Sequence, residues 1–220
     1  MRYDTERQEM LKFISPSARR VLDVGCSTGR FGAALRDHYP EMEVWGIDPT
    51  PHPSDRPQPY ATRLVGEFPA DVPSSEKFDC IVFNDVLEHL VDPWSALRQA
   101  HAHLTSRAEV VVSVPNVRHV WVLRPLLLEG RWDYQDEGIL DRTHLRFFTR
   151  STAIELLETT GYVVREVQGI EWEDDARTQG RLGLVNRILR GRLDDLFAQQ
   201  FALVARPIEP ADADSPRHPG

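Results

Sequence analysis

The chain has 220 residues, of which 41% are hydrophobic and 27% charged, and its formal net charge at pH 7 is −8. These values fit one globular domain with a sizeable core, and the negative charge argues against a nucleic-acid substrate, because phosphates need a concentrated basic surface. No apolar run approaches the roughly 20 residues that span a bilayer, and the charged N-terminus lacks the apolar core of a signal peptide, so we expect a cytoplasmic protein.

Strand-like and helix-like runs alternate along the chain, which is typical of a parallel sheet with helices on both faces. We expect strands over residues 20–25, 43–47, 64–65, 78–83, 109–114, 162–167 and 200–205. One helix is expected to follow an N-cap at Asp92, with Pro93 as its first residue. Another should begin at a capping box formed by Thr152 and Glu155 and end at Gly161.

The two cysteines fall at opposite ends of their predicted strands. Cys26 follows the first strand and Cys80 lies near the start of the fourth. If these strands run parallel, the two thiols are far apart, so we expect no disulfide between them.

Two segments interrupt the alternation. Residues 49–59 hold five prolines, so we expect no full helix after the second strand. Residues 116–148 form a long connection in which we predict no regular structure, and a loop of that length is usually a functional lid. We expect residues 1–207 to form one domain that includes this lid, followed by a disordered tail over residues 208–220. Apolar positions within residues 182–199 predict an amphipathic helix, and a homodimer would form through this helix or through the lid.

The stretch RVLDVGCSTGRFG, residues 20–32, passes from a strand through three glycines into a helix. Such an element is typical of a site for a nucleotide-like cofactor. The spacing of Gly25, Gly29 and Gly32 is not that of the dinucleotide fingerprint G-x-G-x-x-G, so a nicotinamide or flavin enzyme is the weaker alternative.

Three acidic residues make this signal more specific. Asp23 lies inside an apolar strand, where a carboxylate is costly unless it meets a cation or hydrogen-bond donors. Asp48 follows the second strand, where an acid can accept hydrogen bonds from ribose hydroxyls, and Glu67 follows the third, where an adenine amino group would lie. Each acid alone is more often a helix cap or a solvated turn. Together they line the crevice in which open α/β sheets bind ligands.

At this point the chain resembles the class I S-adenosylmethionine-dependent methyltransferases. The matching segments are VLDVGCSTGRFG (21–32), VWGID (44–48), KFDCIVFNDVLEHLVDPW (77–94) and VVVSVPN (110–116). The resemblance covers about residues 15–170 and implies an α/β fold, a Rossmann-like doubly wound sheet of seven strands in the order 3-2-1-4-5-7-6 with strand 7 antiparallel. The glycine loop of this family usually reads D-x-G-x-G-x-G, and here Ser27 replaces the middle glycine.

The resemblance implies S-adenosylmethionine as the cofactor, which carries a sulfonium and an ammonium group and no phosphate. Gly25 and Gly29 would let the backbone approach its methionine part, and Asp23 would lie near the ammonium. The expected cofactor-binding residues are Asp23, Gly25, Cys26, Ser27, Gly29, Asp48, Glu67, Asn84 and Asp85, the last two beside the sulfonium.

Two segments offer residues for the methyl acceptor. In NDVLEHL (84–90), Glu88 and His89 lie beside the site, and His89 is a candidate substrate contact, although Glu88 could simply start a helix and His89 pack beneath it. GILDRTHLRFFT (138–149) resembles a subset of bacterial methyltransferases associated with glycan and natural-product pathways. There His144 is a candidate general base, since an imidazole titrates in the useful range.

The role of His144 has alternatives. Asp141 and Arg142 would orient it or bind the substrate, or all three would form a structural salt bridge that anchors the lid. The rivals for the base are His119 and Asn116, just past the fifth strand, of which His119 is the second candidate catalytic residue. Further candidate substrate contacts are Trp132 and Tyr134, which would stack on a ring or a sugar.

These residues favour O-methylation of a hydroxyl on a small molecule or a glycan. The alternatives are N- or C-methylation of a small metabolite and a non-catalytic adaptor that keeps the fold, although a pure scaffold has no need of a buried Asp23. Neither Cys nor His occurs at zinc-ligand spacing, so we expect no metal site and metal-independent activity.

Overall fold

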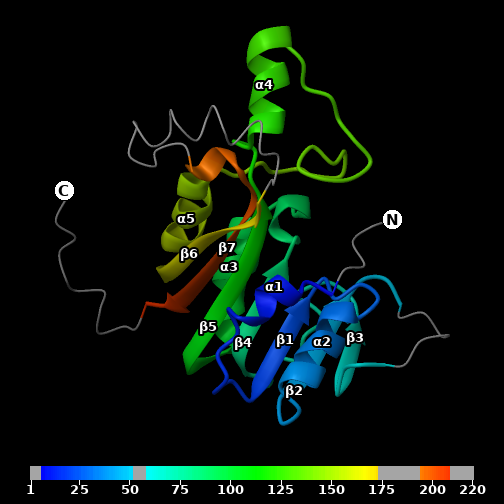
Figure 1. Cartoon of the computed structure of the whole chain (residues 1–220). Helices are drawn as coiled ribbons and strands as arrows, with labels where there is room; N and C mark the ends of the chain where they lie inside the picture. The colour runs from blue at the N-terminus through cyan, green and yellow to red at the C-terminus, as the bar shows by residue number, and fades with distance from the viewer. Residues whose placement is uncertain (1–5, 52–57, 173–193, 209–220) are drawn as a thin grey trace.

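The computed structural model describes residues 6–51, 58–172 and 194–208. Its centre is a seven-stranded sheet in the order β3-β2-β1-β4-β5-β7-β6 (Figure 1). The strands are β1 (Arg20–Val24), β2 (Glu43–Asp48), β3 (Thr62–Val65), β4 (Phe78–Asn84), β5 (Leu104–Pro115), β6 (Tyr162–Trp172) and β7 (Ala198–Pro207). Strands β1 to β5 pair in parallel, and β7 runs antiparallel to both β5 and β6. The order and the antiparallel seventh strand confirm the predicted fold.

Helices cover both faces of the sheet. They are α1 (Gln8–Leu11), α2 (Arg30–His38), α3 (Pro93–Ala100), α4 (Val120–Glu129) and α5 (Arg150–Thr159), with 3-10 turns η1 (Leu87–His89), η2 (His101–His103) and η3 (Asp194–Leu196). Helices α1 and α2 pack on one face, and α3 and α5 pack on the other. Strand β4 contributes to both cores, because Cys80 and Val82 point to the first face and Ile81 and Phe83 to the second.

Two local predictions are confirmed. The carboxylate of Asp92 accepts a hydrogen bond from the Ser95 backbone N–H at 2.9 Å, and Pro93 is the first residue of α3. Both Cys26 and Cys80 are buried free thiols.

Helix α5 begins earlier than predicted. Its N-cap is Thr149, and Thr152 takes the N3 position of the capping box, so Glu155 is not the capping partner. A threonine hydroxyl replaces the expected carboxylate, because Thr152 Oγ1 accepts from the Thr149 N–H at 2.9 Å. Gly161 follows the end of the helix with φ +95°, as the sequence predicts.

The lid, residues 116–148, is not the structureless loop that the sequence predicts, because it contains α4. The helix was missed because Pro125 lies within it and proline normally breaks a helix interior. Figure 1 shows α4 projecting away from the sheet. Its last turn exposes Leu127 and Leu128, each 75% accessible to solvent.

Three further predictions concern segments that the structure describes only in part. Most of residues 182–199, the expected amphipathic helix, and residues 209–220 of the expected tail lie outside the described residues. In the proline-rich segment, the described residues 49–51 and 58–59 contain no helix. Over the described ranges, no helix has the length and apolar character needed to cross a membrane.

The packing of Tyr60 explains the third glycine of the loop–helix element. The Tyr60 side chain is 5% exposed and donates a hydrogen bond from its hydroxyl to Asp23 Oδ2 at 2.6 Å. A Cβ atom at Gly32 would lie 2.2 Å from Tyr60 Cε1, and one at Gly46 would lie 2.9 Å from Tyr60 Cδ2. Gly32 is therefore required for the approach of the Tyr60 ring to α2.

Replacing Gly32 by alanine should destabilise the protein by about 1–3 kcal/mol, because the added methyl group displaces a packed ring. In a Tyr60→Leu background the clashing ring atoms are gone. There the same replacement should stabilise by roughly 0.5–1 kcal/mol, since alanine favours a helix over glycine. Urea unfolding of the four proteins measures both values, and equal destabilisation in the two backgrounds would contradict the contact.

Candidate active site

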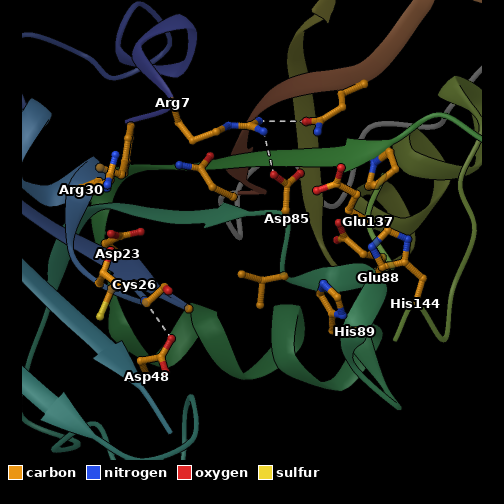
Figure 2. Close-up of a pocket in the computed structure, with 18 of the residues that line it drawn as sticks. Arg7, Asp23, Cys26, Arg30, Asp48, Asp85, Glu88, His89, Glu137 and His144 are labelled. Carbon is orange, nitrogen blue, oxygen red and sulfur yellow. Dashed lines mark hydrogen bonds and ion pairs between the residues drawn. The ribbon is translucent and has the colours of Figure 1, made fainter. Parts of the chain in front are cut away.

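A cavity of about 650 Å³ opens at the carboxyl edge of the parallel strands. It lies where β1 pairs with β2 on one side and β4 on the other, which is the switch point at which open α/β sheets bind ligands. Figure 2 shows Asp23, Cys26 and Asp48 on one side of this cavity and Glu88, His89 and His144 on the opposite side. We call these sides the glycine-loop end and the histidine end.

The glycine loop at the first end follows a sharply bent backbone. Gly25, Ser27 and Gly29 all have positive φ, at +71°, +43° and +86°. A Cβ atom at Gly25 would lie 2.6 Å from Val86 Cγ2, so a larger residue does not fit. Ser27 replaces the usual glycine yet keeps the left-handed conformation, and it lines the cavity without closing it.

Asp48 fixes this loop at the rim of the cavity. Its Oδ2 accepts from the Ser27 backbone N–H at 2.8 Å, and its Oδ1 accepts from the Thr50 N–H at 2.7 Å. Each carboxylate oxygen has more than one acceptor site, so Asp48 retains the capacity to bind hydroxyl groups of a ligand.

Asp23 is a buried carboxylate below the loop, with 2% of its surface exposed. Burial raises its pKa to about 7, the charge of Asp48 adds to this, and the hydrogen bond from Tyr60 and the nearby Arg63 oppose it. A carboxylate held in this way is suited to a ligand that brings positive charge.

Between the two ends lies an ion pair that the sequence reasoning missed. Arg7 Nη1 is 2.7 Å from Asp85 Oδ2, and Nη2 donates to Ser113 Oγ at 3.0 Å and to Gln200 Oε1 at 2.8 Å. Figure 2 shows Arg7 reaching into the cavity above Asp85. An arginine in a charged N-terminal segment carries no sequence signal that separates this role from that of a solvated residue.

Glu88 is the most buried acid at the histidine end, with no exposed surface. Neither of its carboxylate oxygens has a hydrogen-bond partner among the described residues. Burial, with a further contribution from the charge of Asp85, holds its pKa well above the usual range. Its backbone carbonyl accepts from the N–H groups of Leu145 at 2.8 Å and Arg146 at 3.0 Å, which docks the lid onto η1.

His89 and His144 face one another beside Glu88, with ring centroids 4.8 Å apart. His144 Nδ1 lies 3.0 Å from the carbonyl oxygen of Ile139. Since a carbonyl only accepts, we assign the proton to Nδ1 and the lone pair to Nε2. Burial is the main cause that lowers the pKa of His144, which favours the neutral form of its imidazole.

The neighbours of His144 in the lid have separate roles. Asp141 is buried and accepts from the backbone N–H of Thr143 at 2.7 Å and from its hydroxyl at 2.6 Å. Thr143 Oγ1 lies 3.2 Å from His89 Nδ1, so Asp141 orients His89 through Thr143. Arg142 pairs with Asp136 at 2.6 Å on the exposed side of the lid and does not line the cavity.

Two predicted residues after β5 have structural contacts outside the cavity. The Asn116 amide donates to the carbonyl oxygens of Asp195 and Ala198 at 2.6 and 2.8 Å. His119 is the N-cap of α4, and its Nδ1 accepts from the Trp121 N–H at 3.4 Å. Both side chains are buried where they hold the start of the lid to the sheet.

Three other predicted residues also lie away from the cavity lining. Glu67 is exposed, and its backbone N–H donates to Asp71 Oδ2 at 2.8 Å. Trp132 packs edge-on against Phe147, with centroids 5.2 Å apart, and Tyr134 is 55% exposed. The other predicted cofactor residues, together with His89 and His144, do line the cavity.

The comparisons with known proteins agree with the observed fold. A family model described as a methyltransferase domain matches residues 2–167, and a comparison with curated proteins found no match. Many solved structures share the fold at low identity. A SAM-dependent methyltransferase from Archaeoglobus fulgidus is 16% identical with a TM-score of 0.63, and the match covers 91% of this chain and 94% of that one.

Two further solved structures contain bound S-adenosylhomocysteine (SAH). The plantazolicin methyltransferase BpumL, in complex with a pentazolic desmethylPZN analog and SAH, is 14% identical with a TM-score of 0.65, and the match covers 94% of this chain and 87% of that one. The 1,6-didemethyltoxoflavin-N1-methyltransferase of Burkholderia thailandensis is 16% identical with a TM-score of 0.57, and the match covers 87% and 72%. These likenesses show the fold, and the family model covers most of the chain. The protein therefore belongs to the methyltransferase-domain family, as a class I enzyme whose methyl donor is S-adenosylmethionine.

Proposed function

We propose that this methyltransferase transfers the methyl group to a hydroxyl oxygen of a small molecule. The observation that carries the proposal is the composition of the cavity at the carboxyl edge of the sheet. Its glycine-loop end has acids suited to the cofactor, and its histidine end has a neutral imidazole and a buried carboxylate. A ligand seated against the glycine loop would present its methyl group toward His89 and His144 (Figure 2).

The cofactor's groups match the glycine-loop end in charge and hydrogen bonding. The ribose hydroxyls would donate to Asp48, whose two oxygens are held by backbone N–H groups. The ammonium group would lie near Asp23, a buried carboxylate with a raised pKa. The side-chain amide of Asn84 has no hydrogen-bond partner among the described residues, and it would serve the methionine part of the cofactor.

The histidine end favours an oxygen acceptor over a nitrogen acceptor. A neutral amine attacks a methyl group with a lone pair it already holds, whereas a hydroxyl becomes a good nucleophile only as it loses its proton. The Nε2 atom of His144 can accept such a proton, because Nδ1 donates to the Ile139 carbonyl. General base catalysis of this kind contributes typically 10²–10⁴-fold.

Two observations favour a small molecule over a glycan as the acceptor. The bound acceptors named for two similar structures, a desmethylPZN analog and 1,6-didemethyltoxoflavin, are small molecules. Trp132 and Tyr134, the aromatic residues expected to stack on a sugar, do not line the cavity. N-methylation is the second candidate, because the Burkholderia thailandensis enzyme is named an N1-methyltransferase.

His144→Ala should lower turnover by roughly 10²-fold or more with a hydroxyl acceptor, because the group that handles the acceptor proton is lost. The affinity for SAH should stay nearly unchanged, since His144 lies at the opposite end of the cavity from Asp48. Release of SAH over a panel of hydroxylated and aminated small molecules measures turnover, and calorimetry measures affinity.

The matched control for this experiment is His119→Ala, which removes a buried histidine that caps α4 outside the cavity. The folded fraction of this variant should turn over normally. A larger loss of turnover in His119→Ala than in His144→Ala would contradict the role of His144 as the general base. Methyl transfer only to amines would favour N-methylation.

Asp23→Asn should change how stability depends on pH. The pKa of Asp23 is raised from 3.8 to about 7 in the folded protein, so between pH 4 and 7 the folded state holds a proton that the unfolded chain has released. The contribution of Asp23 to the free energy of unfolding is therefore largest below pH 4 and is lost as the pH rises through 7. Without cofactor, the free energy of unfolding of Asp23→Asn minus that of the wild type should increase by on the order of 1–4 kcal/mol from pH 4 to pH 8.

The control for Asp23 is an acid with the opposite shift. Burial alone would raise the pKa of Asp79, but hydrogen bonds from the backbone N–H groups of Arg19 and Arg20 lower it overall. Asp79→Asn should therefore lose stability relative to wild type as the pH rises. Urea unfolding at several pH values measures the stability of both variants. If the difference from wild type changed with pH in the same direction in both, the raised pKa of Asp23 would be refuted.

A further inference from the structure

Glu88 is a buried carboxylate that the proposed mechanism leaves without a partner. It has no exposed surface, and both carboxylate oxygens lack a hydrogen-bond partner among the described residues. It differs in this from Asp23, which accepts from the Tyr60 hydroxyl at 2.6 Å. An isolated buried charge costs several kcal/mol unless a cation or donors compensate it.

Each of the two histidines beside Glu88 has its Nδ1 atom close to a backbone carbonyl oxygen. His144 Nδ1 lies 3.0 Å from the Ile139 carbonyl oxygen, and His89 Nδ1 lies 3.3 Å from the Thr143 carbonyl oxygen. In both rings Nδ1 donates to the backbone, so Nε2 has the lone pair. Metal-binding histidines typically donate their other ring N–H to a carbonyl or a carboxylate in this way.

The geometry points to a divalent metal site: we propose that Glu88, His89 and His144 together bind one transition-metal ion such as Zn²⁺. One ligand atom from each of the three side chains lies within 4.8 Å of the others, and Zn²⁺ holds nitrogen and oxygen ligands at about 2.0–2.2 Å. Two imidazoles and a carboxylate form a set of the kind that zinc enzymes use with an open position. Mg²⁺ is disfavoured because it prefers oxygen ligands.

The role of this ion rests on the proposed O-methylation. An acceptor hydroxyl in an open coordination position would have a lowered pKa and would lose its proton to solvent at neutral pH. Its oxygen would form the new C–O bond as the S–CH₃ bond breaks, giving a methyl ether and SAH. The general-base role proposed for His144 applies to the metal-free site, because with the ion bound the lone pair of Nε2 binds the ion and the acceptor loses its proton to solvent.

The sequence predicts metal-independent activity because its histidines do not show zinc-ligand spacing. Glu88 and His89 are adjacent on η1, whereas His144 lies in the lid. The N–H groups of Leu145 and Arg146 bind the Glu88 carbonyl and so bring the third residue to the first two. Such a tertiary group has no signature in sequence spacing.

Co²⁺ titration of the full-length, tag-free and chelator-treated protein tests the site. The wild type should bind one Co²⁺ per chain with a visible ligand-field spectrum, and Zn²⁺ should displace it. Glu88→Gln, His89→Gln and His144→Gln should each weaken Co²⁺ binding by about 10-fold or more. His38→Gln, a change at an exposed histidine of α2 outside the cavity, should leave the spectrum unchanged.

No ligand-field spectrum in the wild type would overturn the proposal, as would a spectrum that survives all three site variants. Each of the three substitutions introduces a neutral polar side chain. If one variant fails to fold, the other two still decide the outcome. SAH calorimetry on the same samples separates this inference from the proposed function. SAH binding without Co²⁺ binding rejects only the metal site, and Co²⁺ binding without SAH binding rejects only the proposed cofactor seat.

Discussion

Two buried carboxylates in one cavity, Asp23 and Glu88, are the constraint around which this active site is built. Removing a carboxylate from water is costly, and the protein supplies little compensation. Asp23 receives one hydrogen bond from a side-chain hydroxyl, and Glu88 receives none within the described part of the chain. The cavity is therefore matched to ligands that bring positive charge, and the apo protein gives up stability to keep it so. The packing of Tyr60 between Gly32 and Gly46 preserves one half of this arrangement.

The two ends of the cavity are assembled by different means. Asp23 and Asp48 meet because β1 and β2 are parallel and in register, so both strands end at the same edge. The histidine end depends instead on the lid, which is distant in sequence and whose Leu145 and Arg146 N–H groups donate to the Glu88 carbonyl oxygen. Any motion of this lid segment would displace His144 from Glu88 while leaving the cofactor loop intact. The glycine-loop end and the histidine end are thus held by separate parts of the fold.

Much of the fold follows from the sequence, because alternating apolar runs and the glycine loop are local patterns. Strand order came from the resemblance and not from periodicity. The sequence does not predict helix α4, since Pro125 contradicts a helix locally. It offers His119 as a catalytic candidate because a polar residue after a strand looks the same whether it lines a cavity or caps a helix. Arg7 and the meeting of Glu88 with His144 depend on tertiary contacts between distant segments, which a single sequence does not encode as spacing.

We infer that the buried Asp23 receives the positive charge of the cofactor. Calorimetry of SAH binding at pH 7, repeated in buffers of different ionisation enthalpy, measures the protons exchanged on binding. Because the pKa of Asp23 is about 7 in the free protein, the ligand's ammonium group should drive release of roughly half a proton per SAH bound. Asp23→Asn should bind more weakly and release none. Binding by the wild type without proton release, or the same release from Asp23→Asn, would contradict the account.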